Sequence, residues 1–352
     1  MSLEATPEAS LAELRRRYHD LRVARIIRET ADASSIVFEI PDALGEAFAY
    51  ESGQFLTLKV PYDGHTLYRC YSLASSPACD SEHKVTIKRI PDGRISNWVN
   101  DNLGEGDTVA VLPPAGKFVL GDETGPILLF AGGSGITPVI SIVKTALART
   151  DRPLRMLYAN RDRDSIIFRE ELDALAAAHA GRLSITHRLD VDDGFLDATA
   201  VRDWVGTDTA ATFYICGPGP FMDVVEGTLE TLGATADNIY IERFESPPDG
   251  EELDFDPASG EGTKVFVNLD GKRHELDVAP GETILHAAKR AGIDPPFSCE
   301  SGFCGCCMAK MVRGGADMKV NDFLQRDEVE EGWILTCQAL PTDDDNEIEY
   351  PD

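Results

Sequence analysis

The stretch CESGFCGCC, residues 299–307, holds four cysteines within nine residues and is the most informative motif of the chain. The amino-terminal stretch MSLEATPEASLAELRRRYHD has no basic start followed by an apolar run, so it does not have the form of a signal peptide. We therefore expect a cytoplasmic protein whose thiols stay reduced. Clustered cysteines in that compartment indicate metal binding or catalysis before they indicate disulfides.

The spacing of these cysteines is typical of a 2Fe–2S site. Cys299-x4-Cys304-x2-Cys307 is followed, after 29 more residues, by Cys337. Two irons bridged by two sulfides need four thiolates, and one loop can supply most of them while it wraps the cluster. Zinc is the alternative, but zinc ligand pairs usually stand a dozen or more residues apart, whereas three thiols crowd this loop. The sequence therefore predicts an iron–sulfur cluster held by these four cysteines.

The rest of the loop supports this prediction and leaves one ambiguity. Gly302 and Gly305 allow the backbone to fold tightly, so that its N–H groups can point at the sulfurs. The fourth ligand lies in WILTCQA, 333–339, which we predict to be a strand that ties the loop to the core. Cys306 could in principle replace its neighbour Cys307, although the C-x2-C count favours Cys307.

The composition predicts several domains and excludes two classes of partner. A chain of 352 residues is too long for one compact core. Its net charge of −28 repels phosphate backbones and anionic lipids, so we expect no nucleic-acid partner. The longest apolar stretch, 126–143, is broken by Gly, Ser and Pro, so we expect no membrane span. From Pro248 onward there are 24 acidic and 9 basic residues, which indicates either a solubility adaptation or an acidic docking face.

Hydrophobic patterns predict a multidomain β and α/β protein. After a tail, 1–18, short apolar runs such as SSIVFEI and QFLTLKV predict an antiparallel β-barrel over 19–122. Over 123–246, buried-type strands alternate with helical stretches, which predicts a parallel sheet with helices on both faces. An acidic stretch rich in Pro and Gly predicts a linker at 247–263. The last module, 264–352, opens with a predicted hairpin turning at Asp270-Gly271, and a short helix follows.

Two patches of the barrel suit a phosphate-bearing aromatic cofactor. In RCYSLAS, 69–75, Arg69 and Tyr71 point the same way on one strand, and they offer a phosphate partner and a stacking ring. In DGRISNW, 92–98, Gly93 and Ser96 stand at a probable helix start, whose free N–H groups can hold a pyrophosphate. Taken singly, either patch reads as an ordinary strand and turn.

The second domain carries two glycine-rich strand ends. LLFAGGSGITP, 128–138, runs from a strand through Gly132, Gly133 and Gly135 into a helix, where backbone can approach a pyrophosphate. YICGPGPFM, 214–222, places Cys216 and Gly217 at another strand end, where parallel sheets collect ligands. The first loop lacks the GxGxxG fingerprint, so on its own it gives only a weak indication of a dinucleotide site.

In combination these motifs resemble the ferredoxin–NADP reductase superfamily over Leu21 to Phe244. The resemblance implies a flavin, with FAD favoured over FMN by the pyrophosphate patch, and a nicotinamide co-substrate. It implies that Ser72, Cys216 and Glu242 converge on the reacting atoms, where the task is orientation for hydride transfer. The other implied cofactor-binding residues are Arg69, Tyr71, Lys88, Gly93, Ile95, Ser96, Gly132, Gly133, Gly135, Thr137, Gly217 and Phe244.

The last module resembles the plant-type ferredoxins, which implies a β-grasp fold. It departs from them at Glu300, where a basic residue is frequent, and at Cys306, where Ala or Thr is common. These departures bear on the reduction potential and the partner face, and they leave the four ligands intact.

The order of the three modules resembles the reductase components of multicomponent oxygenases. We therefore expect an enzyme that passes electrons from NAD(P)H through FAD and the cluster to a terminal oxygenase. The motifs are most similar to reductases of 3-ketosteroid 9α-hydroxylases, a Rieske-type system, with those of phenylacetyl-CoA epoxidases next. Arg161 and Arg163 could meet the 2′-phosphate of NADPH or pair with neighbouring aspartates, and we lean to NADH. A redox-sensing iron–sulfur protein is the alternative of another class.

Overall fold

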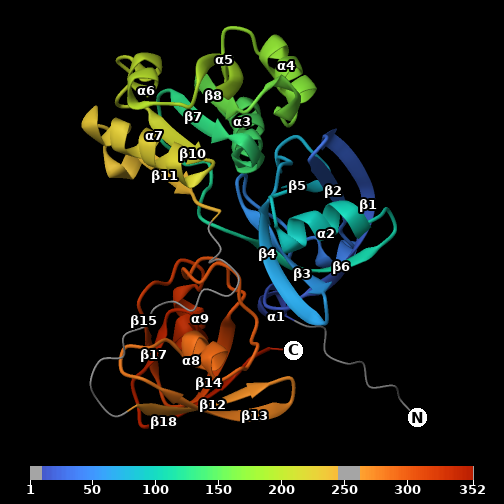
Figure 1. Cartoon of the computed structure of the whole chain (residues 1–352), viewed down its shortest axis with the longest axis vertical. Helices are drawn as coiled ribbons and strands as arrows, with labels where there is room; N and C mark the ends of the chain where they lie inside the picture. Colours follow the sequence, from blue (N-terminus) through green and yellow to red (C-terminus); the bar gives the residue numbers. More distant parts are fainter. Residues whose placement is uncertain (1–9, 245–261, 352) are drawn as a thin grey trace.

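The computed structural model describes residues 10–244 and 262–351 and divides into three modules. In Figure 1 the antiparallel barrel, in blue and cyan, lies between the green and yellow α/β domain and the orange and red carboxy-terminal module. Within the described ranges, the search for a helix long and apolar enough to cross a membrane found none. The multidomain β and α/β fold expected from the sequence is confirmed.

The first module is a closed antiparallel sheet. Its six strands stand in the order β4-β3-β6-β1-β2-β5. An antiparallel bridge between Leu73 and Val85 joins the two edges, so no long edge stays open. Helix α2 buries Ile95 and Val99 against the core of the barrel. The strands and helices are β1 (His19–Thr30), β2 (Ala33–Glu39), η1 (Asp42–Leu44), β3 (Phe55–Tyr62), β4 (His65–Ser72), β5 (His83–Lys88), α2 (Arg94–Asn102) and β6 (Thr108–Ala115).

The second module is a parallel sheet in the order β11-β10-β7-β8-β9 with helices on both faces. Alternate residues of β7 explain the two layers: Leu129 packs in the cluster that contains α3, and Phe130 packs in the one that contains α6 and α7. The elements are β7 (Ile127–Gly132), η2 (Gly133–Gly135), α3 (Ile136–Arg149), β8 (Leu154–Asn160), η3 (Arg163–Ser165), α4 (Arg169–Ala178), β9 (Leu183–Leu189), α5 (Asp190–Asp193), α6 (Ala198–Val205), β10 (Thr212–Cys216), α7 (Gly219–Thr231), η4 (Ala236–Asn238) and β11 (Ile239–Glu242).

The third module is a mixed sheet, β13-β12-β18-β14-β16, that packs on helix α8. Its hairpin turns at Asp270 and Gly271, with φ of 50° and 69°, as the sequence predicts. The predicted strand around Cys337 is shorter than expected, because β16 ends at Leu335 and the cysteine lies in the turn that follows. The elements are β12 (Thr263–Leu269), β13 (Lys272–Val278), α8 (Ile284–Arg290), β14 (Met308–Arg313), β15 (Ala316–Met318), α9 (Arg326–Glu330), β16 (Trp333–Leu335), β17 (Ala339–Pro341) and β18 (Asp345–Glu349).

The segment that the sequence marks as a tail contains a helix. Helix α1 (Leu11–Arg15) begins with a capping box between Ser10 and Glu13. Figure 1 shows α1 at the foot of the barrel, beside the third module. Residues 247–261 of the predicted linker and 1–9 of the predicted tail lie outside the described residues.

Candidate functional site

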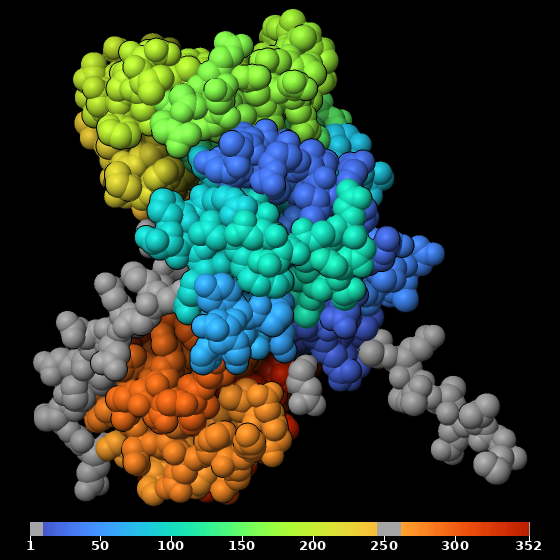
Figure 2. Space-filling model, turned by 45° about the vertical axis from the view of Figure 1, so that its right-hand side comes forward, coloured from blue at the N-terminus to red at the C-terminus, as the bar shows by residue number. Residues whose placement is uncertain are grey.

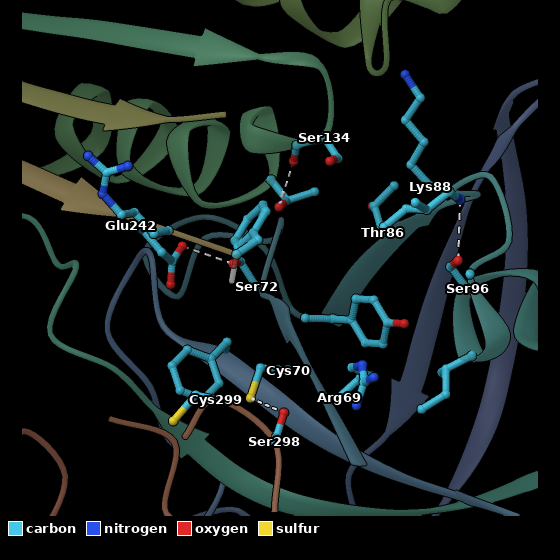
Figure 3. Close-up of a pocket in the computed structure, with 18 of the residues that line it drawn as sticks. Arg69, Cys70, Ser72, Thr86, Lys88, Ser96, Ser134, Glu242, Ser298 and Cys299 are labelled. Carbon is cyan, nitrogen blue, oxygen red and sulfur yellow. Dashed lines mark hydrogen bonds between the residues drawn. The ribbon is translucent and has the colours of Figure 1, made fainter. Parts of the chain in front are cut away.

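A cavity of about 310 Å³ opens where the three modules meet. Strands β4 and β5 and the start of α2 supply one wall, residues 242–244 a second, and the cysteine loop a third. Figure 3 shows Ser72 and Glu242 on one side, Lys88 and Ser96 on the other, and Cys299 below them. Of the residues predicted from the sequence, the lining includes Arg69, Tyr71, Ser72, Lys88, Gly93, Ile95, Ser96, Thr137, Glu242, Phe244 and Cys299.

The barrel side of the cavity suits a flavin nucleotide. Arg69 lines the cavity and donates from Nη1 to the carbonyl oxygen of Tyr68 at 2.8 Å. Burial raises the pKa of the Tyr71 phenol well above its ordinary range, so the ring stays neutral and suits stacking. A guanidinium and a neutral aromatic ring on one strand are the groups that a phosphate-bearing ring system needs.

The start of α2 forms a narrow backbone cradle. Gly93 is the N-cap, and a Cβ there would lie 2.5 Å from Ser96 Oγ and 3.1 Å from the Ile90 carbonyl oxygen. Ser96 Oγ in turn accepts a hydrogen bond from the Ile90 N–H at 3.3 Å. A side chain at this position would crowd the turn, and the first turn of this nine-residue helix lies at the cavity wall, where N–H groups have no partner within the helix. Such a terminus fits a pyrophosphate.

The opposite side of the cavity holds a serine and a carboxyl group in contact. Ser72 Oγ donates to Glu242 Oε2 at 3.0 Å. Burial raises the pKa of Glu242 to about 8, which the hydrogen bond from Ser72 only partly offsets. At neutral pH the Glu242 carboxyl is therefore mostly protonated.

Cys216 stands beside this pair and does not line the cavity. It is fully buried at the end of β10, opposite Glu242 in the parallel register with β11. Burial, and then the charge of Glu242, raise the pKa of its thiol well above the ordinary range. Its predicted place at the reacting atoms remains a prediction.

The glycine-rich strand ends pack on each other. A Cβ on Gly135 would lie 2.2 Å from the Cys216 carbonyl oxygen, and one on Gly217 would lie 3.0 Å from Gly132 Cα. These glycines, with Gly133, do not line the cavity. Gly132, Gly135 and Gly217 allow the segment from β7 into η2 to approach the end of β10 closely, and the predicted contact of the four glycines with a dinucleotide remains a prediction.

The four predicted ligand thiols form two pairs in a buried loop. Each of the four cysteines is at most 6% exposed. Cys299 interacts with Cys304, which also lies against Cys70 and Cys306, and Cys307 interacts with Cys337. The Ser301 N–H donates to Cys299 Sγ at 3.4 Å, which is the backbone contact that a metal-bound sulfur needs.

The two glycines of this loop have the backbone that the prediction requires. Gly302 and Gly305 adopt φ of 86° and 73°. A Cβ on Gly305 would lie 2.3 Å from the Phe323 ring. A tight loop that gathers thiols in two pairs fits a 2Fe–2S cluster.

Family models match all three modules. They are the oxidoreductase FAD-binding domain over 20–120, the oxidoreductase NAD-binding domain over 129–227 and the 2Fe-2S iron-sulfur cluster binding domain over 267–342. A relative from Rhodococcus rhodochrous, the ferredoxin reductase component of 3-ketosteroid-9-alpha-monooxygenase, is 42% identical over 94% of this chain and 96% of its own. The chain belongs to the oxygenase reductase family.

Two further matches are to proteins named for other oxygenase systems. One subunit of the 1,2-phenylacetyl-CoA epoxidase of Escherichia coli is 35% identical over 95% of this chain and 98% of its own. The solved structure of phthalate dioxygenase reductase matches with a TM-score of 0.59 and 26% identity, over 94% of this chain and 98% of that one. This oxygenase reductase is therefore an NAD(P)H-dependent oxidoreductase with FAD and a 2Fe–2S cluster as its cofactors.

Cys70 joins the site of this oxygenase reductase although sequence reasoning assigned it no role. Its Sγ lies 3.7 Å from Ser298 Oγ, and the Sγ atoms of Cys70, Cys304 and Cys306 lie within 4.8 Å of one another. The alternation of β4 was the available signal, because Cys70 points away from the face of Arg69 and Tyr71. Cys306 belongs to this group, whereas Cys307 lies against the predicted ligand Cys337, which favours Cys307 as the ligand.

Arg161 and Arg163, which bear on the choice between NADH and NADPH, follow β8 in this oxygenase reductase. Arg161 Nε donates to Asp162 Oδ2 at 2.7 Å. Neither Arg161 nor Arg163 lines the cavity.

Proposed function

We propose that this oxygenase reductase takes electrons from NADH and delivers them to the terminal oxygenase of a 3-ketosteroid 9α-hydroxylase, a Rieske-type enzyme. The cavity supports this path of electron transfer, because Tyr71 of β4, the strand that we propose binds the flavin, and Cys299 of the cysteine loop line the same space. The identity of the acceptor is supported by relatives of that name at 39–42% identity over most of the chain.

Each wall of the cavity has a separate binding task in this proposal. Arg69 and the α2 terminus bind phosphate groups, Tyr71 stacks on the flavin ring, and Phe244 covers the exposed side of the site. The remaining flavin contacts that we propose are Lys88 and Ile95. When bound, FAD accepts hydride from the nicotinamide and releases electrons singly, and the iron–sulfur cluster carries them one at a time.

The proposed reacting side orients hydride donor and acceptor. Ser72 holds Glu242 in one position through their hydrogen bond, while Cys216 fills the space behind the carboxyl. We propose that Thr137, Gly132, Gly133, Gly135 and Gly217 place the nicotinamide nucleotide over this pair. Holding the two rings in a fixed geometry is the main contribution that such a site makes to hydride transfer.

NADH is the proposed donor because Arg161, one of the two candidates for a 2′-phosphate contact, is already paired. Arg161 is held by Asp162, which would have to give up its ion pair before the guanidinium could bind a phosphate. The ratio of kcat/KM for NADH and NADPH tests this choice, and we expect it to exceed about tenfold in favour of NADH.

Reconstitution tests the proposed acceptor. The holoprotein, NADH and the oxygenase component of a 3-ketosteroid 9α-hydroxylase should form hydroxylated steroid with about one product per NADH. The matched arm replaces the oxygenase with that of a phenylacetyl-CoA epoxidase, which the 35% identical relative makes the second candidate. Coupled product formation only in the second arm would replace the steroid assignment, and slow uncoupled NADH oxidation in both would refute it.

A further inference from the structure

The third module docks on the barrel through its cysteine loop. Phe55, Tyr68 and Cys70 of the barrel pack in one cluster with Cys299, Cys304 and other residues of the loop. The rings of Phe55 and Phe303 meet edge to face across this junction, at 6.3 Å. Figure 2 shows the orange module directly beneath the cyan and blue barrel.

One exposed ion pair and one histidine–carboxylate contact across this junction place the acid on the same side. Lys117 of the barrel meets Asp322 at 2.9 Å, and His65 lies 4.0 Å from Asp294. In both pairs the acid belongs to the third module, in agreement with its excess of acidic residues. Both pairs are more than half exposed, so each contributes little to docking.

Arg16, just after α1, makes a stronger contact of the same polarity. Its side chain is 13% exposed, its Nε donates to Glu328 Oε1 at 3.0 Å, and Nη1 lies 3.5 Å from Glu331. The guanidinium also lies 4.7 Å from the centre of the Trp333 ring. Trp333 begins β16, the strand that leads to the ligand Cys337.

Glu328, which accepts the hydrogen bond from Arg16, is itself held in place. Glu328 Oε2 accepts a hydrogen bond from the Gln325 N–H at 2.8 Å, at the start of α9. The segment after Arg16 makes a second contact, because Tyr18 Oη lies 3.9 Å from Cys306 Sγ, next to the ligand Cys307. Residues 10–18 therefore reach the cluster module at two places, one of which is the cysteine loop itself.

We propose that the amino-terminal segment 10–18 is a latch, in which Arg16 holds Glu328 and Trp333 so that the cysteine loop stays docked against the flavin strand β4. Electron transfer from flavin to cluster then depends on Arg16, although Arg16 touches neither cofactor site. Arg16 is thus a positioning residue, and this part of the inference rests on the proposed function.

The latch gives acidic residues of the third module a function, because Glu328 and Glu331 bind Arg16. A single charge-assisted contact with two carboxylates and an aromatic ring is partly desolvated, which makes it stronger than the exposed pairs at the rim. Without it, the contacts described above that still hold the junction are the small apolar cluster, the polar contacts of Tyr18 with Cys306 and of Cys70 with Ser298, and the two exposed pairs.

The test is a mutant cycle on the full-length holoprotein with Arg16→Gln, Glu328→Gln and the double variant. Glutamine at position 328 keeps an oxygen for the Gln325 N–H, so it removes the charge and spares the cap. Arg17→Gln is the matched control, because Arg17 is a neighbouring exposed arginine. Two readouts are taken: amide hydrogen exchange in 299–307, and the rate of cluster reduction after anaerobic mixing with NADH.

We expect either single variant to raise exchange in 299–307 and to slow cluster reduction, each about tenfold. The double variant should be no worse than one single variant, because the two side chains act through one contact. Flavin reduction by NADH, measured in the same mixing experiment, should stay at the wild-type rate, and Arg17→Gln should match the wild type throughout.

Two results would overturn the latch. One is unchanged exchange in the Arg16→Gln variant; the other is raised exchange with cluster reduction at the wild-type rate. Failure of the proposed function looks different, because a wild-type holoprotein would then fail to reduce its cluster with NADH, while the exchange measurement would still test docking.

Discussion

Glu242 shows how burial at a single residue sets a pH dependence. Its pKa of about 8 exceeds the ordinary 4.5, so the fold favours the neutral carboxyl. The corresponding contribution to the free energy of unfolding is complete below about pH 4.5 and is lost as the pH rises through 8. Ionisation above that pH also places a negative charge at the site where we propose that hydride transfer takes place.

We predict that flavin reduction by NADH slows as the pH passes about 8, and that Glu242→Gln removes this step. Glutamine stays neutral and can still accept the hydrogen bond from Ser72. Stopped-flow absorbance between pH 6 and pH 9.5 measures both proteins. A step at the same pH in the variant would assign the titration to another group.

Cys306 and Cys307 are adjacent thiols with different surroundings. Cys307 pairs with Cys337, whereas Cys306 approaches Tyr18 and Cys70. We predict that Cys306→Ser keeps the 2Fe–2S cluster and that Cys307→Ser loses it. Iron content per chain and the EPR spectrum after reduction distinguish the two, and loss of iron in both variants would contradict the assignment.

At the scale of elements, the close approach of β7 and β10 depends on glycine. A Cβ on Gly135 would meet the Cys216 carbonyl oxygen at 2.2 Å, so α3 would have to shift away from β10. We predict that Gly135→Ala lowers the free energy of unfolding by about 1–3 kcal/mol, measured by urea unfolding.

Gly227 in α7 is the matched control for this substitution. A Cβ there meets nothing within 4 Å, and the residue is exposed within a helix. Gly227→Ala should therefore be neutral or stabilise the protein by up to about 1 kcal/mol. Equal losses in both alanine variants would mean that the crowded contact is not the cause.

At the scale of the whole molecule, a buried lysine ties the barrel to the α/β domain. Lys144 of α3 is 8% exposed, and its Nζ lies 2.6 Å from Asp80 Oδ2 and 2.7 Å from Glu171 Oε1. Asp80 follows the flavin strand, so this contact helps to fix the nucleotide domain relative to the flavin barrel.

We predict that Lys144→Met destabilises the protein by about 2–3 kcal/mol, because the partly buried Asp80 loses its cation and Glu171 keeps only Lys84. The control is Lys264→Met, which breaks an ion pair with Glu275 that is at least half exposed and should cost less than about 0.5 kcal/mol. Urea unfolding measures both, and a small effect at Lys144 would show that water replaces its ion pairs.

Local patterns in the sequence determined the elements and the candidate site of this protein. Cysteine spacing, period-two strands such as β4 and the glycine turns are short-range properties, so the three modules and the predicted ligand cysteines follow from residues close together in the sequence. The contact between Ser72 and Glu242 was reached only through the family resemblance, because 170 residues separate them.

Only the tertiary structure decided how the modules face one another. Arg16 and Glu328 are 312 residues apart, and no periodicity links them. The burial of Cys70 against the cluster loop, the helix within the predicted tail and the raised pKa of Glu242 likewise depend on which surfaces exclude water together. Burial and electrostatics are set by neighbours in space, and a linear pattern does not contain them.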